Sequence, residues 1–254
     1  MEKLFSTEII KKIAPSVFAT KPSSKMSNKY SFVPTIDLME NFEKEGWILS
    51  SVRQSGKGQH SVHELRYRNG QLPNVGDTLP EAIIRNSHNG GCALSVSAGL
   101  FRLCCSNGLT VPTSTAEQFT IRHMGFDSEE VKRLTESFAM KLPKIQNSVD
   151  RMMDRMMTEG EKIEFAKNAS IIKWGMGSVP SSLNFEQLIT PQRDGDNGDD
   201  LWTTFNIVQE KFIRGGVEYK SNKGRNTSLK GLKNIMATNQ MNTKLWTLAE
   251  TLVY

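Results

Sequence analysis

The sequence predicts an α+β fold with an antiparallel sheet in the N-terminal half and mainly helices in the C-terminal half. Up to about residue 125, several segments alternate apolar and polar side chains with the two-residue period of a strand, and glycine-bearing turns separate them. Beyond that point, apolar residues recur at three- and four-residue steps, which is the period of a helix. Strands that precede helices are typical of α+β proteins.

The first 30 residues are lysine-rich and contain the segment KPSSKMSNK, so we expect residues 1–30 to form a flexible basic arm. One short helix is predicted inside this arm, at Thr7–Ile13. The next helix is expected to have Thr35 as its N-cap and to end at Gly46, because glycine commonly follows the last helical residue.

A β-hairpin is predicted after this helix. The strand Trp47–Gln54 and the strand that ends at Arg68 flank the turn SGKGQ. In the second strand, His63, Leu65 and Tyr67 share one face, and Glu64, Arg66 and Arg68 share the other. Two further strands are predicted at Leu79–Asn86 and Ala93–Ala98. A short helix that contains Leu100, Leu103 and Cys104 should follow and end at Asn107-Gly108, and extended segments are expected at Leu109–Val111 and Phe119–Ile121.

The second half begins with a long apolar stripe that runs from Val131 to Met156, and Pro143 should kink or divide this helix. Further helices are predicted after Thr158, which forms a capping box with Glu161, after Asp200, and around Met241 to Leu252. We therefore expect a sheet-rich core at residues 31–125 and a helical part at residues 126–254 that packs on it, as one domain overall.

Composition excludes several classes of protein. The chain has 254 residues, of which 37% are hydrophobic and 23% charged, and its mean hydropathy of −0.42 is typical of a globular protein that faces water. It contains neither an apolar stretch that could span a membrane nor a signal-peptide pattern, so we expect a cytoplasmic protein. The three cysteines, Cys92, Cys104 and Cys105, lack both a disulfide pattern and metal-ligand spacing, and no cofactor is expected.

Basic residues are concentrated in two places. The chain carries 32 Lys and Arg residues against 27 Asp and Glu, which gives a net charge of +5. Residues 211–233 contain seven of the lysines and arginines but a single carboxylate, Glu218, and they include Tyr219. The predicted hairpin is the second basic region and contains Trp47 and Tyr67. Cations beside aromatic rings are typical of surfaces that bind single-stranded nucleic acid.

Motifs for catalysis are sparse. The sequence has no phosphate-binding loop of the GxxxxGK[ST] or GxGxxG type. The acidic run DGDNGDD could hold a divalent cation through Asp194, Asp196, Asp199 and Asp200, but it is better explained as a turn whose last aspartate caps the next helix. A cysteine nucleophile at Cys104 or Cys105 would need His88 or His123 as its base, and burial is again the better explanation.

Two long segments carry a resemblance to a known family. They are IIRNSHNGGCALSVSAGLFRLCCSNGLTV, at Ile83 to Val111, and LITPQRDGDNGDDLWTTFNIVQEKFIRGGVEY, at Leu188 to Tyr219, and a closing helix contains Leu245-Trp246. Their blocks NSHxG, GLFRLxCSNGL and LWTTFNxxQExxxRGG resemble a phage- and plasmid-borne protein family of unassigned function. The order of predicted elements is also similar to the core of ring-forming single-strand annealing proteins, which implies a groove for a nucleic-acid backbone.

We therefore expect a homo-oligomer, possibly ring-forming, that binds or anneals single-stranded DNA in phage or plasmid recombination or replication and is not an enzyme. Two alternatives remain open: a protein that modulates a host defence or nucleic-acid enzyme, and a metal-dependent nuclease that uses the acidic run. The residues expected to bind nucleic acid are Trp47, Arg53, Lys57, Arg66, Tyr67, Arg68, Arg85, Lys211, Arg214, Lys220, Lys223 and Arg225.

Overall fold

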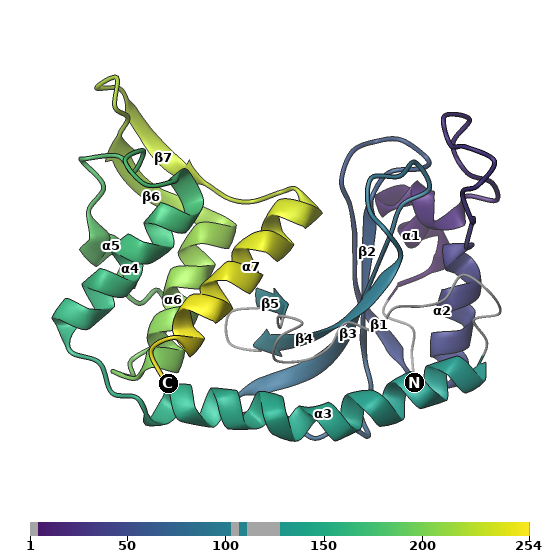
Figure 1. Cartoon of the computed structure of the whole chain (residues 1–254), viewed down its shortest axis with the longest axis horizontal. Coiled ribbons are helices and arrows are strands. Elements are labelled where there is room, and N and C mark those ends of the chain that lie inside the picture. Colours follow the sequence, from purple (N-terminus) through teal and green to yellow (C-terminus); the bar gives the residue numbers. More distant parts are fainter. Residues whose placement is uncertain (1–4, 103–106, 111–127, 254) are drawn as a thin grey trace. The chain divides into compact units, whose positions relative to one another are not determined.

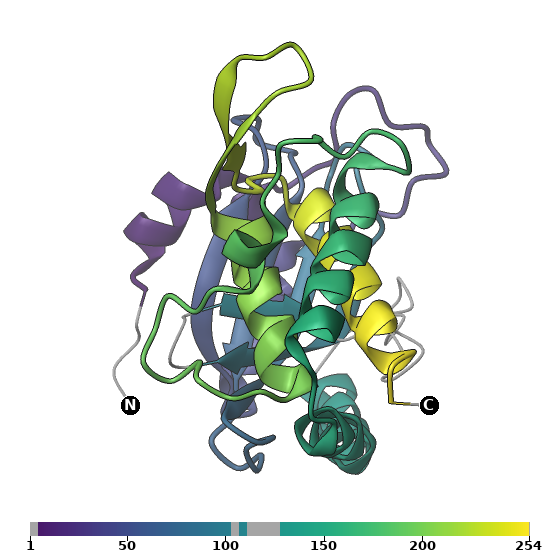
Figure 2. The same ribbon diagram turned by 90° about the vertical axis from the view of Figure 1, so that its left-hand side faces the viewer.

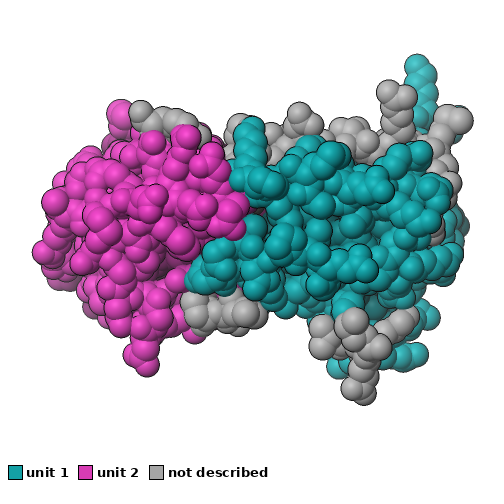
Figure 3. All heavy atoms as spheres, turned by 90° about the horizontal axis from the view of Figure 1, so that it is seen from below, with its two compact units in different colours: residues 1–101, 113–144 teal, residues 102–112, 145–254 magenta. Residues whose placement is uncertain are grey.

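The computed structural model of the chain describes residues 5–102, 107–110 and 128–253, and it confirms the α+β class (Figure 1). Strands β1 to β5 form one antiparallel sheet in the N-terminal half, and β6 and β7 form a separate two-stranded sheet between helices of the C-terminal half. The chain divides into two compact units (Figure 3): unit 1 consists of residues 1–101 and 113–144, and unit 2 of residues 102–112 and 145–254.

The elements follow in this order along the chain: α1 (Thr7–Ile13), the 3-10 helix η1 (Pro15–Phe18), α2 (Thr35–Lys44), β1 (Ile48–Gln54), β2 (His63–Arg68), β3 (Thr78–Asn86), β4 (Ser95–Arg102), β5 (Asn107–Thr110), α3 (Ser128–Asp154), α4 (Glu159–Trp174), α5 (Phe185–Ile189), α6 (Leu201–Arg214), β6 (Gly215–Lys220), β7 (Asn226–Lys230) and α7 (Ile235–Glu250). No helix in the described part of the chain is long and apolar enough to cross a lipid bilayer.

Unit 1 is organised around β2, which pairs antiparallel with β1 on one side and with β3 on the other. Leu65 of β2 lies opposite Val52 of β1 and Ile84 of β3, so apolar side chains from three strands meet on one face. The same core includes apolar residues of α2 and of the first part of α3. The sheet therefore has one apolar face, and the predicted alternation along β2 is confirmed.

The N-terminal segment is part of this core. Ile10 of α1 and Val17 of η1 are both buried in the apolar cluster, together with Ala14 between them. The helix predicted at Thr7–Ile13 is confirmed. The expectation of a flexible arm is wrong for residues 5–18, because their apolar side chains have a place on the sheet that lysine-rich composition did not reveal.

Two predictions of local structure need correction. Thr35 is the first residue of α2 and Pro34 is its N-cap. The helix expected from Leu100 to Asn107-Gly108 is wrong for its described residues, because Leu100 follows the buried Val96 and Ala98 in β4 and Asn107 begins β5. Of the two effects expected of Pro143, a kink or a division, the division does not occur, because α3 continues through this residue. The segment Phe119–Ile121 lies outside the described residues.

Unit 2 is a helical assembly in which α4, α6 and α7 pack against one another (Figures 1 and 2). Thr158 forms the predicted capping box with Glu161 at the start of α4, and the Asp200 carboxylate accepts a hydrogen bond from the Thr203 backbone N–H at the start of α6. The rings of Trp202 and Trp246 meet edge to face in the core, 6.2 Å apart.

A β-hairpin follows α6, where the sequence predicted only a glycine-containing turn. Gly215 ends α6 and begins β6 with a φ of +83°, a conformation that is accessible essentially to glycine alone at its ψ of −153°. A Cβ atom at this position would lie 2.3 Å from the carbonyl oxygen of Leu229 on β7. Gly215 therefore lets the two strands approach closely, and the hairpin projects beyond the ends of α4 and α6 (Figures 1 and 2).

Replacing Gly215 with alanine should destabilise unit 2 by more than the roughly 1 to 3 kcal/mol of backbone strain alone, because the new methyl group also collides with the Leu229 backbone. Gly216→Ala is the matched control, since Gly216 also has a positive φ, of +95°, but no atom lies within 4 Å of the added carbon. Thermal unfolding of both variants measures the difference. Equal destabilisation would show that the close approach contributes nothing.

Candidate nucleic-acid interface

The two aromatic residues expected to stack on bases are buried in unit 1. The ring of Trp47 lies edge to face with Phe42 and Phe138, and its indole N–H donates to the hydroxyl of Thr135 at 2.8 Å. Tyr67 is fully buried and packs against Phe42 at a ring distance of 5.0 Å. Neither ring presents a face to a ligand, so the assignment of Trp47 and Tyr67 as stacking residues is corrected to core packing.

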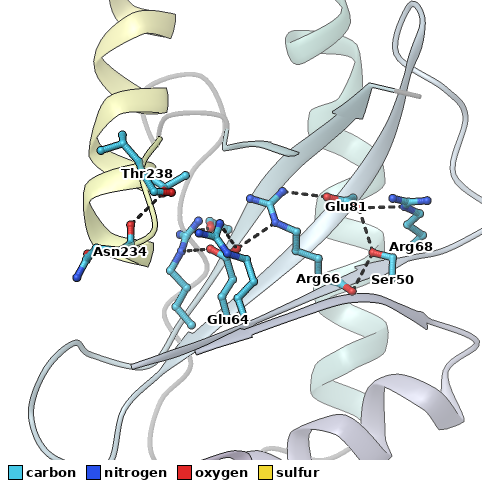
Figure 4. Close-up of polar contacts among 11 residues, drawn as sticks. Ser50, Glu64, Arg66, Arg68, Glu81, Asn234 and Thr238 are labelled. Atoms are coloured by element: carbon cyan, nitrogen blue, oxygen red, sulfur yellow. Dashed lines mark hydrogen bonds and ion pairs between the residues drawn. The ribbon is translucent and has the colours of Figure 1, made fainter. Parts of the chain in front are cut away.

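Four of the predicted arginines lie on the polar face of the unit 1 sheet, where two glutamates contact them. Figure 4 shows Arg66 and Arg68 beside Glu64 and Glu81. Glu64 binds Arg66 at 3.1 Å and Arg85 at 2.8 Å, and Arg53 is 4.0 Å away. Glu81 binds Arg66 and Arg68, both at 2.9 Å. Two of these contacts join cross-strand neighbours, because Glu64 lies opposite Arg53 on β1 and Arg85 on β3, whereas Glu64 and Arg66 both belong to β2.

Burial and charge act in opposite directions on Glu64. Burial alone would raise the pKa of this carboxyl group, but the guanidinium groups of Arg66, Arg85 and Arg53 outweigh that effect and lower it to about 2. Glu64 is therefore ionised at every physiological pH. Arg66 and Arg85 are themselves almost completely buried, and Arg68 packs its guanidinium group 3.8 Å from the ring centre of Phe101. The face is a network of ion pairs that holds neighbouring strands together.

His63 and His88 belong to a second buried polar cluster of unit 1. His63 Nδ1 donates to the carbonyl oxygen of Ser61 at 3.0 Å, since a carbonyl can only accept, and Nε2 then accepts from the Thr35 hydroxyl at 2.8 Å. Asn86 donates to the same Thr35 oxygen, and the Ser16 hydroxyl lies 2.8 Å from His63 Nδ1. The cluster joins η1 and α2 to the sheet.

Burial lowers the pKa of both His63 and His88 to about 4. Both rings are therefore neutral near pH 7, as the hydrogen bonds of His63 require. The thiol of Cys92 lies in the same region, and burial raises its pKa, so it is a poor nucleophile. Cys104, Cys105 and His123 lie outside the described residues.

The acidic run of unit 2 is engaged in structural contacts. Asp196 is buried and ion-paired with Arg102, and Asp199 binds Lys162 at 2.6 Å. Asp200 caps α6, as predicted. Within the described ranges, no group of three or more His, Cys, Asp or Glu residues is placed to hold a metal ion. Asp194 is exposed at the start of the run.

Six of the seven basic residues at positions 211–233 fall into two sets, and the seventh, Lys233, is exposed after the hairpin. Lys211 is buried, which lowers its pKa, and Arg214 lies 3.4 Å from Glu210 within α6. By contrast, four basic side chains on the hairpin strands and in its turn are exposed and have no ion pair to a described carboxylate. These are Lys220, Lys223, Arg225 and Lys230. Lys57 is likewise exposed, in the turn between β1 and β2 of unit 1.

An aromatic residue that the sequence did not single out lies at the base of the hairpin. Trp174, the last residue of α4, contacts Tyr219 of β6 edge to face at 5.9 Å, and Phe212 of α6 at the same distance. Trp174 and Tyr219 are both partly exposed. The run WGMG is the sequence signal that could have identified Trp174. Gly175 ends the helix directly after the tryptophan, so the ring lies at the edge of the unit.

Beside these rings the hairpin borders an open hollow of about 740 Å³, lined by Ser182, Glu218, Tyr219, Lys220, Asn226, Thr227 and Ser228. The Ser182 hydroxyl fastens the preceding loop to β6, because it donates to the carbonyl oxygen of Lys220 at 2.6 Å and accepts from its backbone N–H at 2.8 Å. Exposed cations, a partly exposed ring and a polar hollow thus occur together in unit 2.

Residues 22–246 match the family described as Domain of unknown function (DUF932). The chain belongs to the DUF932 family. It is also similar to two proteins of Escherichia coli (strain K12), UPF0380 protein YafZ and UPF0380 protein YfjQ, each 29% identical over 258 residues that cover 99% of this chain and 93% of the relative. No solved structure matches the chain significantly. The range matched to DUF932 contains Trp174 and the whole β6–β7 hairpin.

Replacing Glu64 with glutamine should destabilise the protein by about 3 to 5 kcal/mol, because it removes the carboxylate that two buried guanidinium groups contact. Urea unfolding measures the loss. Glu218→Gln is the control: this glutamate is exposed on the hairpin, and the same chemical change there should shift stability by less than about 0.5 kcal/mol. A similar small effect at Glu64 would contradict the ion-pair network.

The free energy of unfolding should fall as the pH is lowered from about 6.5 to 4. His63 and His88 have folded-state pKa values of about 4, below the ordinary value of 6.5, so the unfolded chain binds more protons in this window. The stabilisation is complete above pH 6.5, and on the order of 2 to 3 kcal/mol per imidazole is lost by pH 4. Urea unfolding at successive pH values tests this. A His88→Gln variant should show a shallower decline; an unchanged slope would contradict the assignment.

Proposed function

We propose that the chain binds single-stranded DNA through the β6–β7 hairpin, as a sequence-independent binding or strand-annealing protein of recombination or replication. The observation that carries the proposal is the state of the hairpin cations. Lys220, Lys223, Arg225 and Lys230 are exposed on one short element, and no ion pair to a carboxylate engages them within the described part of the chain. Exposed cations along a ribbon are suited to contact successive phosphates, which releases counterions.

The hairpin differs from the arginine-rich face of unit 1 in this respect. Arg66 and Arg85 are buried and contact Glu64, so their charge stabilises the sheet. We therefore assign phosphate binding to the hairpin and a structural role to these arginines. The partly exposed Tyr219 supports the choice, because cations beside aromatic rings are typical of surfaces for single strands.

The biological setting is part of the same proposal. A bacterial cytosol, with a phage or plasmid context, fits the similarity to two Escherichia coli proteins and the sequence blocks that resemble a phage- and plasmid-borne family. Strand annealing needs two strands held at once, which a homo-oligomer could provide by presenting several hairpins. Measuring the mass of the protein in solution, with and without a DNA strand, shows whether it forms such a homo-oligomer.

Neutralising two hairpin cations, by Lys223→Gln with Arg225→Gln, should weaken binding of a single-stranded oligonucleotide and lower the slope of log affinity against log salt by about 1.4, which is roughly 0.7 per lost phosphate contact. Fluorescence anisotropy over a salt series measures the slope. The control is Lys12→Gln with Lys25→Gln, which removes the same charge from exposed positions of unit 1. Equal effects of the two double variants, or no salt-sensitive binding by the unaltered protein, would overturn the proposal.

A further inference from the structure

The open hollow beside the hairpin has the composition of a site for one nucleobase. Its lining combines one aromatic ring, Tyr219, with the cation Lys220, the carboxylate Glu218 and short polar side chains. A base needs an aromatic surface for its ring face and hydrogen-bonding groups for its edge, while the attached phosphate needs a cation. The lining supplies all three within unit 2. The polar side chains are Ser182, Asn226, Thr227 and Ser228.

The ring of Tyr219 is held in position by contacts within unit 2. Its neighbour across the hairpin is Thr227, and Trp174 contacts it edge to face at an interplanar angle of 77°. Trp174 in turn contacts the buried Phe212. A ring supported in this way loses little conformational freedom when a ligand stacks on it. Tyr219 can therefore offer its remaining surface to a planar group.

We propose that this hollow accepts one unpaired base of a bound strand, stacked on Tyr219, while the hairpin cations hold the neighbouring phosphates. The inference rests on the proposed function and deepens it, because it assigns the preference for single strands to a specific residue. In a duplex, the bases are stacked and paired and their faces are not available. Phosphate contacts alone would not distinguish the two forms, whereas a stacking site would.

Two strands of equal length and charge test the proposal: an oligo-dT strand and an abasic deoxyribose-phosphate strand. The unaltered protein should bind the oligo-dT strand roughly 5- to 150-fold more tightly, which is the range for stacking of one base. Tyr219→Ala should abolish this difference, and Tyr219→Phe, which keeps the ring, should preserve it. Anisotropy at a fixed salt concentration measures all of these affinities.

Tryptophan fluorescence reports where the base binds. Trp47, Trp202 and Trp246 are buried, so Trp174 is the tryptophan that lies at the surface of the protein. Saturation with oligo-dT should quench its emission, and Trp174→Phe should remove the response. The abasic strand should leave the emission unchanged.

The outcomes separate this inference from the function on which it rests. Equal affinity for the oligo-dT and abasic strands, with salt-sensitive binding of both, would overturn the base site and leave phosphate binding by the hairpin intact. A preference for oligo-dT that survives Tyr219→Ala, or an unchanged tryptophan emission at saturation, would also overturn it. Failure to bind either strand would overturn both proposals. A matched oligo-U strand shows whether the site accepts RNA as well.

Discussion

A guanidinium group is stable inside a protein when a carboxylate lies against it, and this constraint governs unit 1. Glu64 and Glu81 provide that charge on the polar face of the sheet, where they contact arginines from three neighbouring strands. Because the β1–β2 and β2–β3 pairs both contribute to the network, the register of these strands and the position of the charges depend on each other. The same contacts remove Arg66 and Arg85 from the set of residues available to a ligand.

The other face of this sheet has the opposite character and holds the first elements of the chain. Trp47 and Tyr67 belong to its apolar core, and His63 lies in a buried cluster of hydrogen bonds that includes Ser16 and Thr35. A neutral imidazole in that position can donate on one side and accept on the other, which joins η1 and α2 to β2. The unit thus uses both polar and apolar contacts to fix the segment that precedes the sheet.

Unit 2 presents its cations differently. The hairpin begins at Gly215, where a side chain would collide with the Leu229 backbone of β7, and it projects beyond the ends of α4 and α6 (Figure 1). Lys223 and Arg225 lie in the turn between β6 and β7 and remain exposed. Trp174 and Tyr219 mark the place where this basic ribbon meets the helices. Charge and an aromatic surface therefore adjoin each other on one structural element.

Much of the secondary structure follows from short-range patterns that the sequence displays. The alternation in β2 and the caps at Thr158 and Asp200 are local, because they involve neighbours within a few residues, and each was predicted correctly. The β6–β7 hairpin was missed, since its strands are only six and five residues long and are rich in polar and glycine residues. In such short, polar segments the sequence pattern does not distinguish a two-stranded β-hairpin from a turn.

The amino-acid sequence alone determined the α+β class, the faces of β2 and the concentration of charge after α6. Only the tertiary structure decided which cations are exposed, because ion pairing depends on carboxylates that are distant in sequence, as Glu81 is from Arg66. It also decided that Trp47 is buried while Trp174 is at the surface. Burial depends on how helices and strands pack against one another, so the sequence of a single helix or strand does not predict it.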